Sequence, residues 1–232
     1  MLKDYVAVDL ETTGLSAKED KIIEIGAIKI IDGREAEVFE SFVNPARLIS
    51  YKITQVTGIN DEMVKDAPYI EELIEELLEF IGDLPLLGHN LMFDYSFVKR
   101  AAVNSGLDFE KQGIDTLKLA RKYLTELESK RLDYLCKYFG IEDENHHRAL
   151  NDARAAYRLY EVLCDKYGAG KENIYDLNYS VKRETPITPR QVTYLKDLIK
   201  KHNIEADYDV ERLTKNEASR KIDNILAAYG RW

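Results

Sequence analysis

Two acidic residues lie at the end of an apolar run near the N-terminus. The run Tyr5-Val6-Ala7-Val8 is typical of a buried strand, and Asp9 and Glu11 follow it two positions apart. Because side chains alternate across a strand, both carboxylates project from the same face. Two buried carboxylates this close repel each other and take up a proton unless a cation balances them. The pair is a candidate site for a hard divalent cation such as Mg²⁺, the alternative being a strand end with two hydrated acids.

Two further acids occupy positions where apolar residues belong. Asp94 lies on the apolar face of a helix predicted over residues 91–105, and Asp152 lies on the apolar face of a helix predicted over residues 149–167. Buried acids need partners. Taken alone, Asp94 is also consistent with a core carboxylate held by a nearby helix N-terminus.

A histidine precedes the last of these acids. His147 lies five residues before Asp152, on the segment that leads into the helix, from where its side chain can reach the same site. Its reference pKa of about 6.5 suits proton abstraction near neutral pH. An isolated histidine is more often a surface or capping residue, which is the interpretation for His146.

Four carboxylates match the charge of two divalent cations, and two such ions about 4 Å apart catalyse in-line displacement at phosphorus.

The elements that must position these residues alternate between strands and helices. After the first strand, an Asp32-Gly33 turn between two strand-like runs predicts an antiparallel hairpin. This meander followed by alternating strands and helices indicates an α/β sheet covered on both sides. The further strands are expected at residues 22–30, 37–43 and 84–88 and near residue 114, and the further helices at 53–58, 70–81, 116–124 and 132–139.

Composition restricts the class of protein. The 232 residues carry a net charge of −9, which argues against a surface coated in Lys and Arg but not against an enzyme that holds a polyanion through metal ions. The chain has no 18-residue apolar run and no signal-like start, so neither membrane insertion nor secretion is expected. Cys136 and Cys164 are interpreted as reduced core residues of a cytoplasmic protein.

Three motifs resemble those of one enzyme family. Residues 9–14 match D-x-E-T-T-G, residues 89–94 match H-N-x-x-F-D, and residues 147–152 match H-x-A-x-x-D. Together they resemble the DEDDh 3′→5′ exonucleases, the DnaQ-like group that includes the proofreading epsilon subunit of bacterial DNA polymerase III. The resemblance covers roughly residues 4–166 and includes the segments 56–59 and 114–117.

The resemblance implies a fold and a set of roles. The fold would be ribonuclease-H-like, a mixed five-stranded α/β sheet with helices on both faces. Two Mg²⁺ or Mn²⁺ ions would be bound by four carboxylates, and His147 would be the general base. The backbone around Thr12 and the side chain of Leu15 would hold and wedge the terminal nucleotide. The metal ligands would be Asp9, Glu11, Asp94 and Asp152.

The implied activity is release of nucleoside 5′-monophosphates from the 3′ ends of DNA, with single strands preferred. A DNA polymerase or another replication or repair protein is the implied partner. An exoribonuclease of the same family is the closest alternative, because the two substrates differ by one 2′-hydroxyl per sugar. A non-catalytic scaffold is a remote alternative, since carboxylates on apolar stripes cost stability without metal.

The C-terminal part differs electrostatically from the rest. Residues 182–232 hold 11 Lys and Arg against 8 Asp and Glu, so the acidic excess lies entirely before them. Capping boxes beginning at Thr188 and Thr214 predict two helices, each with an apolar stripe. The expected organisation is an exonuclease domain at 1–168, a linker at 169–185 and a small helical module at 186–232. The module is expected to add affinity for nucleic acid or a protein partner, or else only to stabilise the core.

Overall fold

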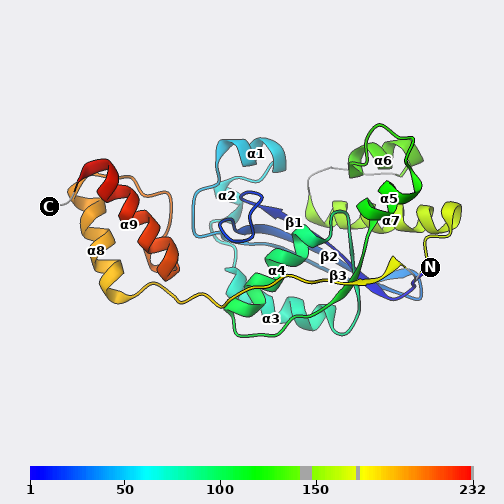
Figure 1. Cartoon of the computed structure of the whole chain (residues 1–232), viewed down its shortest axis with the longest axis horizontal. Helices are drawn as coiled ribbons and strands as arrows, with labels where there is room; N and C mark the ends of the chain where they lie inside the picture. Colours follow the sequence, from blue (N-terminus) through cyan, green and yellow to red (C-terminus); the bar gives the residue numbers. More distant parts are fainter. Residues whose placement is uncertain (142–147, 171–172, 231–232) are drawn as a thin grey trace. The chain divides into compact units, whose positions relative to one another are not determined.

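The computed structural model describes residues 1–141, 148–170 and 173–230. The chain divides into two compact units (Figure 1). Unit 1 comprises Met1–Pro45 and Ile49–Val181, and unit 2 comprises Ala46–Leu48 and Lys182–Trp232. The domain boundaries expected from the sequence remain a prediction.

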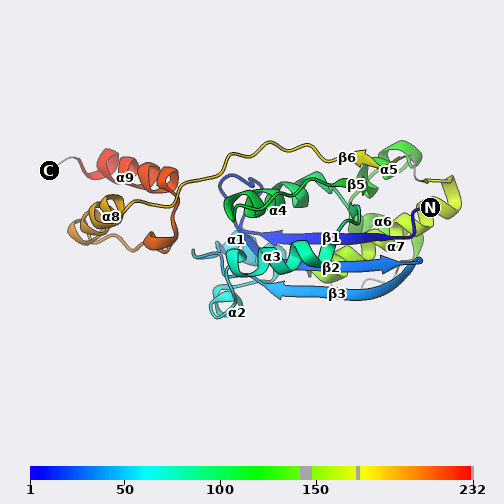
Figure 2. The same ribbon diagram turned by 90° about the horizontal axis from the view of Figure 1, so that it is seen from below.

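Unit 1 is built around a mixed sheet in the order β3-β2-β1-β4-β5-β6. The first three strands form an antiparallel meander, and the Asp32-Gly33 turn joins the second to the third, as predicted (Figure 2). β4 and β5 extend the sheet in parallel and β6 closes it antiparallel. The strands are β1 (Tyr5–Thr12), β2 (Ile22–Ile31), β3 (Arg34–Phe42), β4 (Leu86–Gly88), β5 (Gln112–Asp115) and β6 (Tyr175–Asp176).

Helices and side chains cover both faces of the sheet. Val6, Val8 and Leu10 pack in one core cluster with residues of α3 and α4. Tyr5 and Ala7 pack in the other with residues of α5, α6 and α7. Because side chains alternate along a strand, Asp9 and Glu11 lie on the same face of β1 as Tyr5 and Ala7, the face covered by α7. The helices are α1 (Tyr51–Thr57), α2 (Asp61–Val64), α3 (Ile70–Ile81), α4 (Met92–Asn104), α5 (Thr116–Tyr123), α6 (Leu132–Phe139) and α7 (Ala149–Tyr167).

The predicted fold class is confirmed, but the predicted strand count was one too low. The sixth strand, β6, has two residues and lies within the segment expected to be a linker. It pairs with Gln112 and Gly113 of β5, and the next residue, Leu177, is buried. Two residues cannot display an alternating pattern, so only the distant pairing partner reveals this strand.

Within the described residues, no helix is long and apolar enough to span a lipid bilayer.

Unit 2 contains the two predicted helices, α8 (Pro189–Lys201) and α9 (Lys215–Tyr229), and both capping boxes are present. A short 3₁₀ turn, η2 (Val210–Arg212), packs with them around one apolar cluster. The segment 46–48 belongs to this unit because Arg47 forms a β-bridge with Tyr208 and an ion pair with Glu217 at 3.3 Å. Two lysines of this basic segment form ion pairs, Lys196 with Glu211 and Lys221 with Asp207.

Candidate active site

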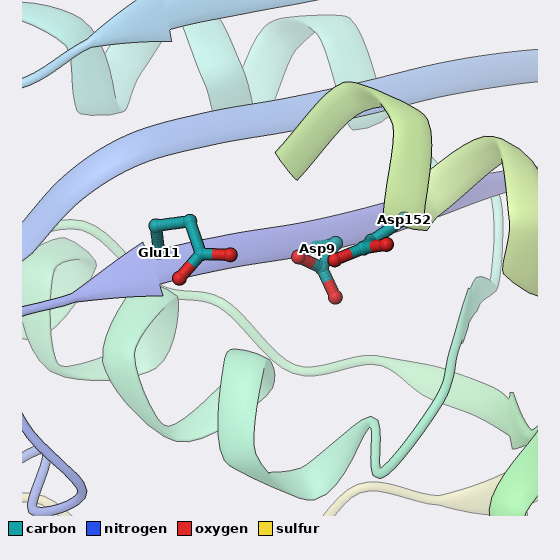
Figure 3. Close-up of side chains that lie close together, drawn as sticks. All are labelled: Asp9, Glu11 and Asp152. Atoms are coloured by element: carbon teal, nitrogen blue, oxygen red, sulfur yellow. The ribbon is translucent and has the colours of Figure 1, made fainter. Parts of the chain in front are cut away.

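Three of the predicted carboxylates converge beside the sheet. Asp9 and Glu11 come from β1 and Asp152 comes from the first turn of α7, and all three are half-buried. One carboxylate oxygen from each lies within 4.8 Å of the other two (Figure 3). A strand with period two and the start of a long helix thus bring together acids that are about 140 residues apart in sequence.

Asp94 reaches the same region from the other side of β1. It lies in the first turn of α4 and is 2% exposed. The helix α4 follows β4, which ends at Gly88. The Asp94 carboxylate accepts a hydrogen bond from the backbone N–H of Leu10 in β1 at 3.0 Å. This bond fixes Asp94 against the strand that carries Asp9, although Asp94 is not one of the three whose oxygens lie within 4.8 Å.

The electrostatics of this cluster favour a bound cation. Burial and then repulsion from Asp94 and Asp152 raise the pKa of Asp9 well above its ordinary value. Burial, followed by repulsion from Asp152 and Glu24, raises the pKa of Glu11 to about 8. Burial raises the pKa of Asp94 as well, against two backbone hydrogen bonds that lower it. Hard carboxylate oxygens are the ligands that Mg²⁺ and Mn²⁺ prefer, so the residues present fit such ions.

A buried glutamate that the sequence analysis missed holds the start of α7. Glu24 of β2 is fully buried, and its two carboxylate oxygens accept hydrogen bonds from the backbone N–H of Ala149 at 3.0 Å and the guanidinium of Arg148 at 2.8 Å. It therefore caps the helix N-terminus from outside the helix. The available signal was an acid inside an otherwise apolar strand, the same signal that identified Asp9.

A glycine beside Asp9 lets the helix approach. Gly26 of β2 lies opposite Asp9 in the antiparallel pair. A Cβ atom at this position would lie 2.1 Å from the backbone nitrogen of Leu150 and 2.3 Å from the carbonyl carbon of Ala149. The first turn of α7 therefore packs directly on the backbone of β2, which brings Asp152 to the carboxylates of β1.

Of the three remaining predicted site residues, the structure describes Thr12 and Leu15. His147 and His146 lie outside the described residues, so the role of His147 stays a prediction. Thr12 is buried, and its hydroxyl donates to the carbonyl of Gly14 at 2.6 Å. Leu15 is 89% exposed, an unusual exposure for a leucine and compatible with the predicted contact to a nucleotide.

The two polar residues that open the second motif tie loops together. His89 bonds the hydroxyl of Thr116 through Nδ1 and the carbonyl of Lys130 through Nε2, both at 2.9 Å. Burial lowers the pKa of His89, so the imidazole is neutral at pH 7, with Nε2–H as the donor to the carbonyl. Asn90 adopts a positive φ of 71°, and its backbone N–H donates to Asp115 at 2.9 Å.

Sequence relatives share this part of the chain. The model of the RNase_T family, described as exonuclease, matches residues 6–160. The DNA polymerase III PolC-type protein of Caldanaerobacter subterraneus subsp. tengcongensis is 40% identical over 199 residues, which are 85% of this chain and 14% of that protein. The protein of the same name from Bacillus subtilis is 37% identical over 239 residues, 96% of this chain and 17% of that protein. The chain thus spans a small part of the length of these relatives.

Solved structures share the fold. Exonuclease X in complex with 5′ overhanging duplex DNA superposes with a TM-score of 0.58 at 27% identity, covering 73% of this chain and 96% of that one. Escherichia coli exonuclease I in complex with a dA16 oligonucleotide superposes with a TM-score of 0.63, covering 72% of this chain and 42% of that one. At 19% identity, the second similarity concerns the fold alone.

The comparisons confirm the resemblance seen in the three motifs. The family model spans both carboxylates of β1, the Asp94 motif and the start of α7, and it covers more than half of the chain. The chain therefore belongs to the RNase_T family of exonucleases.

Proposed function

We propose that this chain is a divalent-metal-dependent 3′→5′ exonuclease that releases nucleoside 5′-monophosphates from the 3′ ends of DNA. The observation that carries the proposal is the convergence of Asp9, Glu11 and Asp152 within 4.8 Å, with buried Asp94 beside them. Such a cluster is electrostatically unfavourable by itself. Two divalent cations would balance its charge.

The mechanism divides the work between the acids and the histidine. Asp9, Glu11, Asp94 and Asp152 would hold the ions, which when bound supply the Lewis acidity that activates a water and stabilises charge on the phosphate and leaving oxygen. His147 would accept the proton of the attacking water, since a neutral imidazole is a competent base near pH 7. In sequence it precedes Asp152 by five residues, and α7, whose N-terminus Glu24 caps, begins at Ala149.

The substrate end of the site would lie along the β1–β2 connection. There the backbone around Thr12 would hold the terminal nucleotide, and the exposed side chain of Leu15 would wedge against its base. Single-stranded 3′ ends would react fastest, because the terminal nucleotide must leave its stack to reach the ions. The net charge of −9 is compatible with such a substrate because the ions neutralise the phosphate locally.

DNA is favoured over RNA by the relatives. Both polymerase relatives are named DNA polymerase III PolC-type, and Exonuclease X was solved with a DNA duplex. We propose that the chain acts in replication or repair in the cytoplasm, beside a DNA polymerase or another protein of that apparatus. A pull-down of purified polymerase on the immobilised chain would test this association, and absence of binding with or without DNA would contradict it.

Degradation assays test the activity. A 5′-labelled single-stranded DNA should shorten as a ladder in Mg²⁺, faster than a paired duplex and faster than RNA of the same sequence. Immediate release of labelled mononucleotide would show the opposite polarity, and faster loss of RNA would favour the exoribonuclease alternative. Activity lost in EDTA and restored by Mg²⁺ or Mn²⁺ would exclude a non-catalytic scaffold.

Replacement of the predicted base tests the mechanism. His147→Ala should lower the rate by about 10²–10⁴, the usual contribution of a positioned base, while leaving the Mg²⁺ dependence nearly unchanged. His146→Ala is the matched control, because it removes a neighbouring imidazole and should retain activity. Full activity of His147→Ala from pH 6 to 9, with an inactive His146→Ala, would assign the base to the other histidine.

A further inference from the structure

A cavity of about 530 Å³ adjoins the carboxylate cluster. Asp152 lines it, as does His89, the residue that follows β4. Three basic residues, Arg121, Lys130 and Arg131, are also in its wall. The volume lies in the range of small-molecule sites and is sufficient for part of a nucleotide.

The basic residues differ in whether they are already paired. Arg131 forms an ion pair with Asp133 at 3.1 Å, and the amine of Lys130 donates to backbone carbonyls of Thr125 and Leu127. Arg121, in the last turn of α5, makes no hydrogen bond or ion pair with any residue of the described chain. An exposed guanidinium with no partner among the described residues, in the wall of a cavity that Asp152 also lines, is available for an anionic ligand.

The wall that carries Lys130 and Arg131 is fixed in place. The His89 imidazole joins the hydroxyl of Thr116, the first residue of α5, to the carbonyl of Lys130. The hydroxyl of Thr116 also lies 3.1 Å from the carbonyl of Gly88, the last residue of β4. The second motif therefore connects the strand that leads to Asp94 with both parts of the basic wall, α5 and residues 130–131.

We propose that this cavity binds a backbone phosphodiester of the nucleic-acid strand next to the one being cleaved, with Arg121 as its principal ligand. The proposal rests on the exonuclease function and deepens it. A strand whose scissile phosphate lies at Asp152 brings a neighbouring phosphate along, and a planar guanidinium can donate two parallel hydrogen bonds to it. Lys130 adds positive charge at the same wall, whereas the charge of Arg131 is offset by its ion pair with Asp133, which also lines the cavity.

Arg121→Gln tests the proposal, and Lys122→Gln is its matched control. The two residues are neighbours in α5, both are exposed, and each substitution removes one positive charge. Lys122 does not line the cavity, and its amine donates to Asn173 at 3.1 Å. Melting temperatures of both variants equal to that of the wild-type protein would show that neither substitution disturbs the fold.

The measurements are kcat and KM for a single-stranded oligonucleotide in Mg²⁺, and its binding by fluorescence anisotropy in Ca²⁺ between 50 and 300 mM salt. Arg121→Gln should weaken binding about tenfold at the lowest salt and leave kcat within about twofold. It should also reduce the slope of log K against log salt by about 0.7, the value for one phosphate contact on a single strand. Lys122→Gln should change neither quantity by as much.

A substrate change identifies the phosphate. A neutral methylphosphonate at the second linkage from the 3′ end should weaken binding to the wild-type protein but cause little further loss in Arg121→Gln. Equal losses of oligonucleotide binding in Arg121→Gln and Lys122→Gln would overturn the proposal. An unchanged salt slope in Arg121→Gln would overturn it as well. Weaker inhibition of Arg121→Gln by nucleoside 5′-monophosphate, with unchanged oligonucleotide binding, would overturn it in favour of a product site.

These outcomes separate the two proposals. A protein that binds DNA through Arg121 but does not hydrolyse it would contradict the proposed function and leave the phosphate site standing. A protein that hydrolyses DNA from its 3′ end with the same KM before and after Arg121→Gln would contradict the phosphate site and leave the function standing.

Discussion

Replacing Gly26 with alanine should separate the helix that carries Asp152 from the strand that carries Asp9. The added Cβ would lie 2.1 Å from the backbone nitrogen of Leu150, whereas ordinary van der Waals contact begins at 3.4 Å. The atoms in the way are backbone atoms, so no rotamer change can relieve the overlap. The first turn of α7 must move outward by about 0.9 Å to reach the shortest Cβ separation that occurs, 3.0 Å, and by about 1.3 Å to reach ordinary contact.

The movement has a cost in stability and a cost in metal binding. Overpacking of this kind costs about 1–3 kcal/mol, and loss of the hydrogen bond from Ala149 to Glu24 adds about 1 kcal/mol, the usual value of a helix cap. The total of about 2–4 kcal/mol should therefore lower the melting temperature by about 4–16 °C. A displaced ligand should raise the Mg²⁺ concentration for half-maximal activity about tenfold, and a 1 Å misplacement can lower the rate by about 10².

The assay is a Mg²⁺ titration of exonuclease activity, performed beside thermal unfolding in EDTA. Leu77→Ala is the control for lost stability, because Leu77 is fully buried in α3, in the core cluster on the opposite face of the sheet from α7. It should cost about 2–5 kcal/mol and leave the Mg²⁺ dependence unchanged. A Gly26→Ala protein that melts lower but keeps the wild-type Mg²⁺ requirement would refute the reasoning, since Asp152 would then be positioned without the close contact.

The other predictions concern charge and the C-terminal unit. The pKa of Glu11 is raised in the folded protein from 4.5 to about 8, so folding takes up a proton when the pH lies between these two values. The metal-free protein should therefore lose stability as the pH rises from about 4.5 to about 8. Melting temperatures in EDTA and in Mg²⁺ should diverge over this window, and parallel curves would contradict the shift. Asp94→Asn keeps an oxygen that accepts from the Leu10 N–H but removes a charge that raises the pKa of Asp9. In urea unfolding at pH 8, the free energy of unfolding of the metal-free protein should therefore rise by about 1 kcal/mol, while activity is lost. A chain truncated after Arg183 should keep its turnover on short oligonucleotides but bind longer ones more weakly and with a shallower salt dependence, whereas equal salt slopes would leave a protein-partner or structural role for unit 2.

Much of the local structure follows from the sequence alone. The apolar positions of α3, the Asp32-Gly33 hairpin and the capping boxes at Thr188 and Thr214 all lie where the patterns predicted them. These features depend on residues within a few positions of one another, so local propensity and periodicity are sufficient to predict them. The acids Asp9, Asp94 and Asp152 could be singled out for the same reason, because each interrupts an apolar pattern that is visible locally.

Their arrangement in space depended on the tertiary structure. The contact of Glu24 with Arg148 joins residues 124 positions apart, and Gly26 matters only because the start of α7 packs against it. The two-residue strand β6 exists because Gln112 and Gly113 offer it an open edge. In each case the role of a residue is set by a backbone brought from far along the chain, and a pattern read within one segment carries no information about that partner.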